Sequence, residues 1–503
     1  MPPVRPDLAA VVVPTHAGAV EGQISNGVTS FKGIPYAATP FGANRFRPPQ
    51  PPKRWSGVRA AHEYGAVPPQ SPYPEPFRHM LGDAGTSGED YLNLNVWTPE
   101  AGARGLPVMV WLHGGAFLRG SGAIPVYDGS RFARDGVVCV TINYRLGAEG
   151  FLWLDDRIAN LGLLDQLAAL HWVQENIGAF GGDPGNVTVF GESAGAFSVA
   201  SLIAIRESSG LFRRAILQSG AGHHVISTGT AKRISAMFCE LLGVPQSAEA
   251  VAAVPVERFV EAQAELDLER VKNPDPGRWG EVAINGMLFE PVIDGEILRE
   301  RPIDSIAAAA AGAGLQLLIG TTTEEWRLFT VPTGVIDYID DERARGLAKR
   351  QGLDPQKAIT AYRETSPAAT AGDVYSAIIS DFFFRIPAIR LAEAQLRNGG
   401  DVRMYEFAWR SPMFDGRLGA SHALELGFVF DHLDCAGPML GEHPPQRLAD
   451  DMHRAWVNFA RNGDPGWPRY ETSRRPVMRF DTQGGVVVND PAASTRQLWE
   501  GIR

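Results

Sequence analysis

Ser193 lies in the pentapeptide GESAG, residues 191–195, between the apolar run 187–190 and the small-residue stretch 196–200. The pattern predicts a strand that turns sharply into a helix, with the serine raised on the turn as a nucleophile. The alternative is that the two glycines only let a strand and a helix pack closely, and a short motif alone has a high false-positive rate. A serine hydroxyl is a weak nucleophile near neutral pH, so acyl transfer also requires a base and an acid elsewhere in the chain.

Two adjacent carboxylates, Glu324 and Glu325, follow the strand-like run 315–319. In serine hydrolases of the α/β class, the acid and then the histidine follow the serine along the chain. They lie on loops at the carboxyl ends of parallel strands, where such sheets bind ligands. Both glutamates fit this order, whereas Asp294 resembles a turn residue between short extended segments. The alternative for the two glutamates is a solvated loop, the usual place of surface carboxylates.

Four histidines follow these glutamates, and His422 is the best candidate for the base because loop 416–422 follows the last strand-like run. His432 is the second candidate, His443 lies beside two prolines, and His453 lies in a helical pattern. A general base must be neutral to accept a proton. We therefore expect kcat/KM to rise through an apparent pKa near 6 to 7, the ordinary range of histidine.

The glycine-rich segment HGGAF, residues 113–117, follows another strand-like run. Backbone N–H groups of such a loop, with that of the residue after the serine, stabilise the oxyanion of acyl transfer. An ordinary glycine turn is the alternative. The loop, the GESAG turn, a carboxylate at a strand end and a late histidine occur here in the order that a serine hydrolase requires. This chemistry uses no metal or organic cofactor, and the three cysteines show no metal-binding spacing.

The elements that must position these residues are apolar runs alternating with helical patterns. The apolar runs cover 108–112, 137–143, 187–190, 215–218, 315–319 and 403–409. Such alternation predicts an α/β fold with a large, mostly parallel sheet covered by helices on both faces. The proline-rich first hundred residues predict antiparallel edge strands and loops. We expect one domain, 1–503, with helical insertions at about 231–310 and 335–400.

Composition restricts the partners. A chain of 503 residues with 44% hydrophobic residues can bury a large core. Its net charge of −10, with no long basic run, argues against nucleic acid and anionic membranes as partners. No apolar run reaches the length of a membrane span, and the apolar run near the N-terminus is too short for a signal peptide. We expect a cytoplasmic monomer or small homo-oligomer that acts on a small molecule.

From about residue 16 to the mid-460s the chain resembles the type-B carboxylesterase family, which includes bacterial para-nitrobenzyl esterases and the cholinesterases. The resemblance implies the α/β-hydrolase fold and hydrolysis of carboxylic esters through an acyl-enzyme. It implies Ser193, Glu325 and His422 as the triad, and Gly115, Ala116 and Ala194 as oxyanion donors. It rests on the segments FKGIPYA, RFRPPQP, SGEDYLNLNVWTP, WLHGGAF, INYRLGAEGFL, NLGLLDQLAALHWVQENIGAFGGDPGNVTVFGESAG, FRRAILQSG, IGTTTEEW, DFFFRIPAIRLAEAQ and GASHALELGFVF.

The resemblance also implies two structural ion pairs, Arg45 with Glu89 and Arg145 with Asp165. Tyr91 stands where many members, especially secreted ones, have a bridged cysteine, so that disulfide is absent. This agrees with a reducing compartment.

Trp326 stands where a small glycine commonly follows the acid in the family. Trp326, Phe382 and Phe383 are candidates for the substrate pocket, with core packing as an equally good interpretation. His223 is a further candidate for the pocket wall. Carbamate or amide hydrolysis by the same triad is the alternative activity. A non-catalytic cholinesterase-like binding domain is a more distant one.

Overall fold

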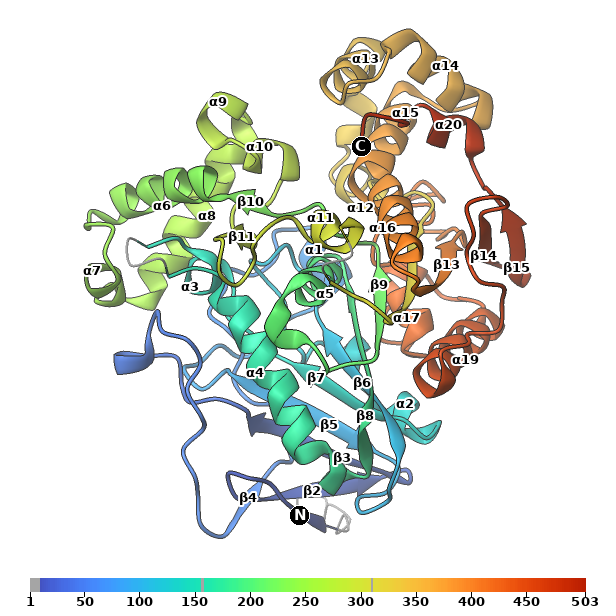
Figure 1. Cartoon of the computed structure of the whole chain (residues 1–503). Coiled ribbons are helices and arrows are strands. Elements are labelled where there is room, and N and C mark those ends of the chain that lie inside the picture. The colour runs from blue at the N-terminus through green and yellow to red at the C-terminus, as the bar shows by residue number, and fades with distance from the viewer. Residues whose placement is uncertain (1–9, 155–157, 309–310) are drawn as a thin grey trace, which may run out of the picture.

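The computed structural model describes residues 10–154, 158–308 and 311–503, and a single large sheet runs through the molecule (Figure 1). The strands described in this sheet have the order β1-β2-β3-β5-β7-β6-β8-β9-β12-β13-β14-β15, with β4 paired beside β2. Their bounds are β1 (Ala10–Pro14), β2 (Ala19–Ser25), β3 (Val28–Pro35), β4 (Val58–Ala60), β5 (Asn93–Thr98), β6 (Leu106–Leu112), β7 (Val138–Ile142), β8 (Gly182–Glu192), β9 (Arg214–Gln218), β12 (Gln316–Thr322), β13 (Asp401–Phe407), β14 (Pro476–Asp481) and β15 (Gly484–Asn489).

The centre of the sheet is parallel and both its ends are antiparallel. Strands β7, β6, β8, β9, β12, β13 and β14 pair in parallel. The pairs β1–β2, β2–β3, β3–β5 and β5–β7 are antiparallel, as the first hundred residues predict. An antiparallel hairpin of β14 and β15 forms the other end. The carboxyl ends of the parallel strands therefore meet at one edge, where the candidate site lies.

The central strands are buried on both faces because their apolar side chains alternate between two core clusters. Val108 and Val110 of β6 belong to one cluster, and Met109 and Trp111 to the other. Each fully buried side chain of this size stabilises the fold by about 1.5–3 kcal/mol. The near-continuous apolar runs in the sequence reflect this burial on both faces.

Helices cover both faces of the sheet. Helix α4 (Leu161–Asn176) and helix α5 (Ala194–Ala204) pack on the face of the first cluster, and α19 (Gln446–Asn462) packs on the other. Within the described residues, no helix has both the length and the apolar character needed to cross a membrane.

Helices α6–α11 and α13–α16 fall largely within the two predicted helical insertions. In Figure 1, α6–α10 lie at the upper left and α13–α15 at the upper right, whereas α11 packs against α16 between them. One domain with insertions stays a prediction.

The remaining α-helices and strands are α1 (Phe77–Leu81), α2 (Ser130–Arg134), α3 (Gly147–Phe151), α6 (Thr228–Leu242), α7 (Ala248–Ala252), α8 (Val256–Lys272), α9 (Pro276–Trp279), α10 (Val282–Asn285), α11 (Pro302–Ala307), α12 (Arg327–Thr330), α13 (Asp341–Arg350), α14 (Pro355–Thr365), α15 (Ala371–Ser380), α16 (Ile386–Arg397), α17 (Leu426–Val429), α18 (Gly437–Leu440), α20 (Ala493–Gln497), β10 (Ile226–Ser227) and β11 (Val292–Ile293).

One of the two implied ion pairs is present and the other is wrong. Arg145 Nη2 lies 2.7 Å from Asp165 Oδ1, with both side chains buried. Arg45 Nη2 instead lies 2.6 Å from Glu149 Oε1, whereas Glu89 is exposed. Glu149 lies in the short helix α3 and is buried, so it needs a cation far more than a carboxylate in water does.

Candidate active site

The turn from β8 into α5 holds Ser193 in a strained conformation, with φ 56° and ψ −124°. A positive φ is rare for a residue with a side chain and costs about 1–3 kcal/mol. The flanking glycines permit the close approach that maintains it. A Cβ atom on Gly195 would lie 2.0 Å from the carbonyl oxygen of Leu112, and one on Gly191 would lie 2.6 Å from the carbonyl carbon of Gly195. Close packing and a raised serine are thus two parts of one local structure.

The glycine-rich loop that follows β6 lies against this turn. A Cβ atom on Gly114 would lie 3.1 Å from Cβ of Ser193. Gly115 and Ala116 both have positive φ, 113° and 55°. The N–H of Ala194 is at the first position of α5, where helix amides have no intrahelical acceptor. In the described part of the chain, the N–H groups of Gly115, Ala116 and Ala194 donate no hydrogen bond to another protein group. All three amides are therefore available to a ligand atom.

His422, on the loop between β13 and α17, is held by Glu325 at the end of β12. Its Nδ1 lies 2.6 Å from Glu325 Oε2, and its backbone N–H donates to the Glu325 carbonyl at 3.1 Å. The other carboxylate oxygen, Oε1, accepts a hydrogen bond from the N–H of Thr322 at 2.9 Å. Both side chains are buried. This arrangement fixes the imidazole ring and orients Nε2 away from Glu325.

Glu324 has a different environment from its neighbour. Its carboxylate accepts a hydrogen bond from the N–H of Ala420 at 2.9 Å and forms ion pairs with Arg327 and Arg410. The structure therefore brings Glu325, and not Glu324, against His422. Position along the chain alone could not separate the two residues.

The later histidines lie elsewhere. His432 Nε2 is 3.0 Å from the carbonyl oxygen of Asp128, and His453 Nδ1 is 2.7 Å from that of Val429. His443 is exposed. Of the late histidines, His422 is the one that contacts Glu325.

Glu192, the second residue of GESAG, faces His422 from the other side. Its Oε1 lies 3.0 Å from His422 Nε2, and both side chains are buried. Burial disfavours the imidazolium, but Glu192 and Glu325 together outweigh burial and raise the pKa of His422 to about 10. The ordinary histidine pKa expected from the sequence therefore does not describe this ring. The only sequence signal was an acidic residue at the variable position of the motif.

A third buried carboxylate, Glu425, interacts electrostatically with Glu325 and Glu192. Its Oε1 accepts hydrogen bonds from Gln218 Nε2 at 3.0 Å and from the Tyr405 hydroxyl at 2.9 Å. Burial first, and then Glu325 and Glu192, raise the pKa of Glu425 to about 8. Sequence reasoning selected His422 from the segment GASHALELGFVF and missed Glu425, because nothing in the segment indicates that this glutamate is buried.

A cavity of about 510 Å³ opens beside Ser193 and His422. Its volume is in the range of small-molecule sites. Gly115 and Ala116 contribute to its wall, so the serine, the histidine and the glycine-rich loop face one space. The rest of the wall is largely apolar, and includes Phe77, Met80, Leu118, Ile124, Val126, Leu328, Phe329, Leu424, Leu426 and Met439.

The four predicted pocket residues, Trp326, Phe382, Phe383 and His223, do not line this cavity. Phe383 packs on His224, with ring centroids 4.0 Å apart, and on Trp326 at 5.4 Å. These contacts correct the expectation and agree with the alternative of core packing.

Phe382 packs on Trp499, with ring centroids 6.0 Å apart, and therefore belongs to a packed layer beside the site. His223 is half-buried, and burial lowers its pKa to about 3. Their aromatic type was the only sequence signal, and it does not distinguish a cavity wall from a core.

Comparison with known proteins gives one consistent result. Residues 9–499 match the carboxylesterase family. The para-nitrobenzyl esterase of Bacillus subtilis (strain 168) is 38% identical, over 97% of this chain and 98% of that protein. The phenmedipham hydrolase of Pseudarthrobacter oxydans is 35% identical, over 95% and 96%.

Solved structures agree. A crystal structure of the Geobacillus stearothermophilus carboxylesterase superposes with a TM-score of 0.85 at 39% identity, covering 97% of this chain and 99% of that one. A PNB esterase structure gives a TM-score of 0.84 at 37% identity with the same coverage. The predicted α/β-hydrolase fold is thereby confirmed. The chain belongs to the carboxylesterase family and is a hydrolase that acts on ester bonds.

Proposed function

We propose that the chain hydrolyses carboxylic esters with Ser193 as nucleophile, His422 as general base and Glu325 as the carboxylate that orients the base. The observation that carries the proposal is the 2.6 Å contact between His422 Nδ1 and Glu325 Oε2, beside a cavity that Ser193 also lines. A carboxylate on Nδ1 favours the tautomer whose Nε2 can accept the serine proton, and it stabilises the imidazolium that results.

The reaction proceeds in two halves. Ser193 Oγ attacks the ester carbonyl carbon while His422 Nε2 takes the hydroxyl proton, and the oxyanion is held by the amides of Gly115, Ala116 and Ala194. His422 then gives the proton to the leaving alcohol as the C–O bond breaks. Water attacks the acyl-serine, again with His422 as base, and releases the acid and free Ser193.

Nε2 contacts Glu192 at 3.0 Å, and this contact favours the protonated ring. His422 must lose that proton before it can accept the proton of Ser193. We therefore expect activity to increase toward alkaline pH, beyond the ordinary range of histidine.

The apolar wall of the cavity favours esters with a hydrophobic group in preference to charged ones. Carbamates and amides remain the alternative substrates, because the same residues would attack their carbonyl carbon. Two relatives of this chain, the para-nitrobenzyl esterase and the phenmedipham hydrolase, are named after different substrates, so family membership alone does not select the substrate.

The test compares wild type with Ser193→Ala on p-nitrophenyl esters of increasing acyl length, with aryl carbamates and anilides in parallel. We expect kcat of the variant to fall by roughly 10⁶-fold, the scale for a triad serine. Mass spectrometry after an organophosphate should show one adduct on wild type and none on the variant. Normal turnover by Ser193→Ala contradicts the proposal, and absence of both turnover and adduct on wild type favours a binding domain.

We also propose a cytoplasmic location and a monomer or small homo-oligomer. The thiol of Cys139 is buried inside β7 and Cys435 is an exposed free thiol, which suits a reducing compartment. Cell fractionation and light scattering after gel filtration test the two statements.

A further inference from the structure

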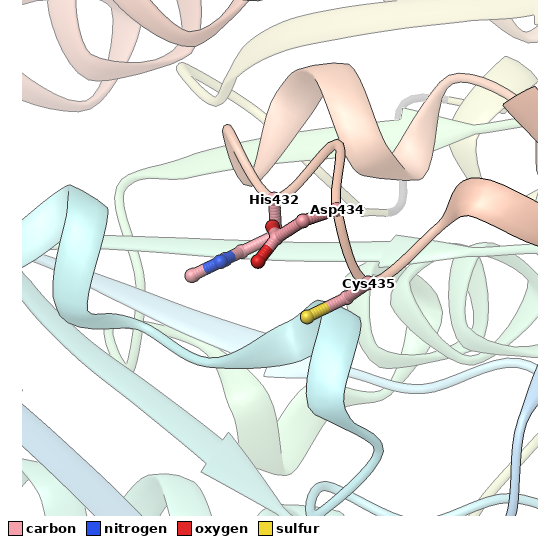
Figure 2. A group of neighbouring side chains, drawn as sticks. All are labelled: His432, Asp434 and Cys435. Atoms are coloured by element: carbon pink, nitrogen blue, oxygen red, sulfur yellow. The ribbon is translucent and has the colours of Figure 1, made fainter. Parts of the chain in front are cut away.

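Three side chains with metal-binding atoms converge on the loop between α17 and α18. His432, Asp434 and Cys435 each offer one ligand atom, and these atoms all lie within 4.8 Å of one another. Figure 2 shows the imidazole, the carboxylate and the thiol on neighbouring positions of this loop. The ester chemistry uses none of the three.

One ring nitrogen of His432 already has partners on Asp128. Its Nε2 lies 3.0 Å from the carbonyl oxygen of Asp128 and 3.8 Å from the Asp128 carboxylate, so an Nε2–H that donates there leaves the lone pair of a neutral ring on Nδ1. Metal-binding histidines usually make such a second hydrogen bond, which fixes the ring and its tautomer.

The loop separates two hollows. Cys435 lines the cavity that contains Ser193 and His422. Asp434 lines a polar hollow on the outside, together with Arg131, Arg134 and Asp450. A cation bound between Asp434 and Cys435 would reach the loop from the outside and act on the wall of the ester cavity.

We propose that His432, Asp434 and Cys435 form a binding site for a divalent cation of the zinc class. One nitrogen, one oxygen and one sulfur ligand suit Zn²⁺, whereas Mg²⁺ and Ca²⁺ prefer oxygen ligands alone. Three protein ligands leave water as the fourth ligand of a tetrahedral ion. A metal binds the thiolate form of cysteine, so binding releases the thiol proton of Cys435 as the sulfur–metal bond forms.

The direct test is metal binding to the purified full chain. Zn²⁺ is titrated by calorimetry, and Co²⁺ is used as a spectroscopic probe because a cobalt–thiolate bond gives a charge-transfer band. We expect one ion per chain, the band in wild type, and no band in Cys435→Ser. His432→Gln should weaken Zn²⁺ binding at least about tenfold, the lower scale for changes even in outer-shell groups.

One variant is the control. His443→Gln removes an exposed histidine of the same region and should bind as wild type does. Circular dichroism checks that each variant is folded. Absence of binding to wild type, or equal binding by wild type, His432→Gln and Cys435→Ser, would overturn the proposal.

A consequence for turnover rests on the proposed ester hydrolysis. Zn²⁺ should lower kcat/KM for long-chain p-nitrophenyl esters more than for the acetate, because the ion fixes one wall of the cavity. His432 lies outside that wall, so His432→Gln should hydrolyse esters as wild type does in the absence of zinc. Zn²⁺ should not lower kcat/KM of this variant. Ser193→Ala separates the two proposals, because it should bind Zn²⁺ as wild type does although hydrolysis is lost. Zinc binding and ester hydrolysis are therefore tested independently of each other.

Discussion

At the scale of single residues, the site depends on which of two adjacent carboxylates contacts the base. Glu325 is buried against His422, whereas Glu324 is bound to Ala420 and two arginines. Glu325→Gln keeps the size of the side chain but removes the charge and favours the wrong tautomer. We expect kcat to fall on the order of 10⁴-fold, the scale of such a change in a serine triad.

The matched control is Glu324→Gln, which keeps an oxygen for the N–H of Ala420. Because Glu324 contacts Ala420, Arg327 and Arg410 and not His422, kcat of this variant should stay close to that of wild type. Both variants are assayed on one p-nitrophenyl ester after their thermal unfolding has been compared with that of wild type. If Glu324→Gln is nearly inactive while Glu325→Gln keeps its activity, the assignment of Glu325 as the acid is wrong.

We expect Glu192 to set the pH range of the proposed base, His422. Its carboxylate raises the pKa of His422, and the neutral ring is the active form, so removing the charge must lower the pKa and extend activity to lower pH. We expect Glu192→Gln to move the rising limb of kcat/KM down by about 1–3 pH units, the usual effect of one close opposite charge. The profile is measured from pH 5 to 10.

Glu324→Gln is again the control, because Glu324 does not contact His422, and its rising limb should coincide with that of wild type. An unchanged limb in Glu192→Gln, with chemistry shown to be rate-limiting, would mean that Glu192 does not act on the base.

At the scale of elements, the turn from β8 into α5 and the end of β6 are in direct contact through Gly195 and Leu112. A methyl group on Gly195 would overlap the Leu112 carbonyl oxygen, so Gly195→Ala must separate the two elements. Overpacking costs about 1–3 kcal/mol of stability. Because the loop after β6 supplies the proposed oxyanion donors, a shift near 1 Å should cost about 100-fold in kcat.

Gly178→Ala is the matched control, because a Cβ there meets nothing within 4 Å. Denaturant unfolding and kcat are measured on both. If Gly195→Ala keeps the stability and kcat of wild type, the contact does not hold the two elements in register.

The elements that could be predicted are those with one dominant local signal. The run 187–190 and its glycines predict the serine turn, and the HGGAF loop follows its strand as expected, because apolar strands and glycine turns are encoded over a few residues. The choice of Glu325 required the family resemblance, since nothing local distinguishes it from Glu324. Glu192 could not be recognised as a partner of His422, because 230 positions of chain separate the two residues and only the fold joins them.

The pocket and one ion pair could not be predicted for the same reason. Aromatic residues such as Phe383 fill cores and cavity walls alike, and only the packing of α15 and α16 around them places this one against His224. Arg45 is joined to Glu149 and not to Glu89 because burial decides which carboxylate requires a cation. Burial depends on the whole fold.

At the scale of the whole molecule, the sheet ends in strand β15, whose outer side pairs with no strand of the described chain. Val486 on this strand is 53% exposed, and Val487 beside it is 40% exposed. An open edge with apolar side chains can pair with the same edge of another molecule, and natural proteins often place lysine there to prevent it.

On warming, the protein should therefore lose activity because molecules aggregate through their β15 edges, before the proposed triad itself unfolds. Val486→Lys should increase the fraction of activity recovered after heating at high protein concentration, with turbidity reduced and kcat unchanged. Leu268→Lys on α8, a side chain of equal exposure at 53%, introduces the same charge away from any strand and should give no such protection. Equal protection by both would attribute the benefit to net charge. The resistance of this enzyme to heat would then be decided by the sheet's last hairpin, a part of the molecule that takes no part in the proposed chemistry.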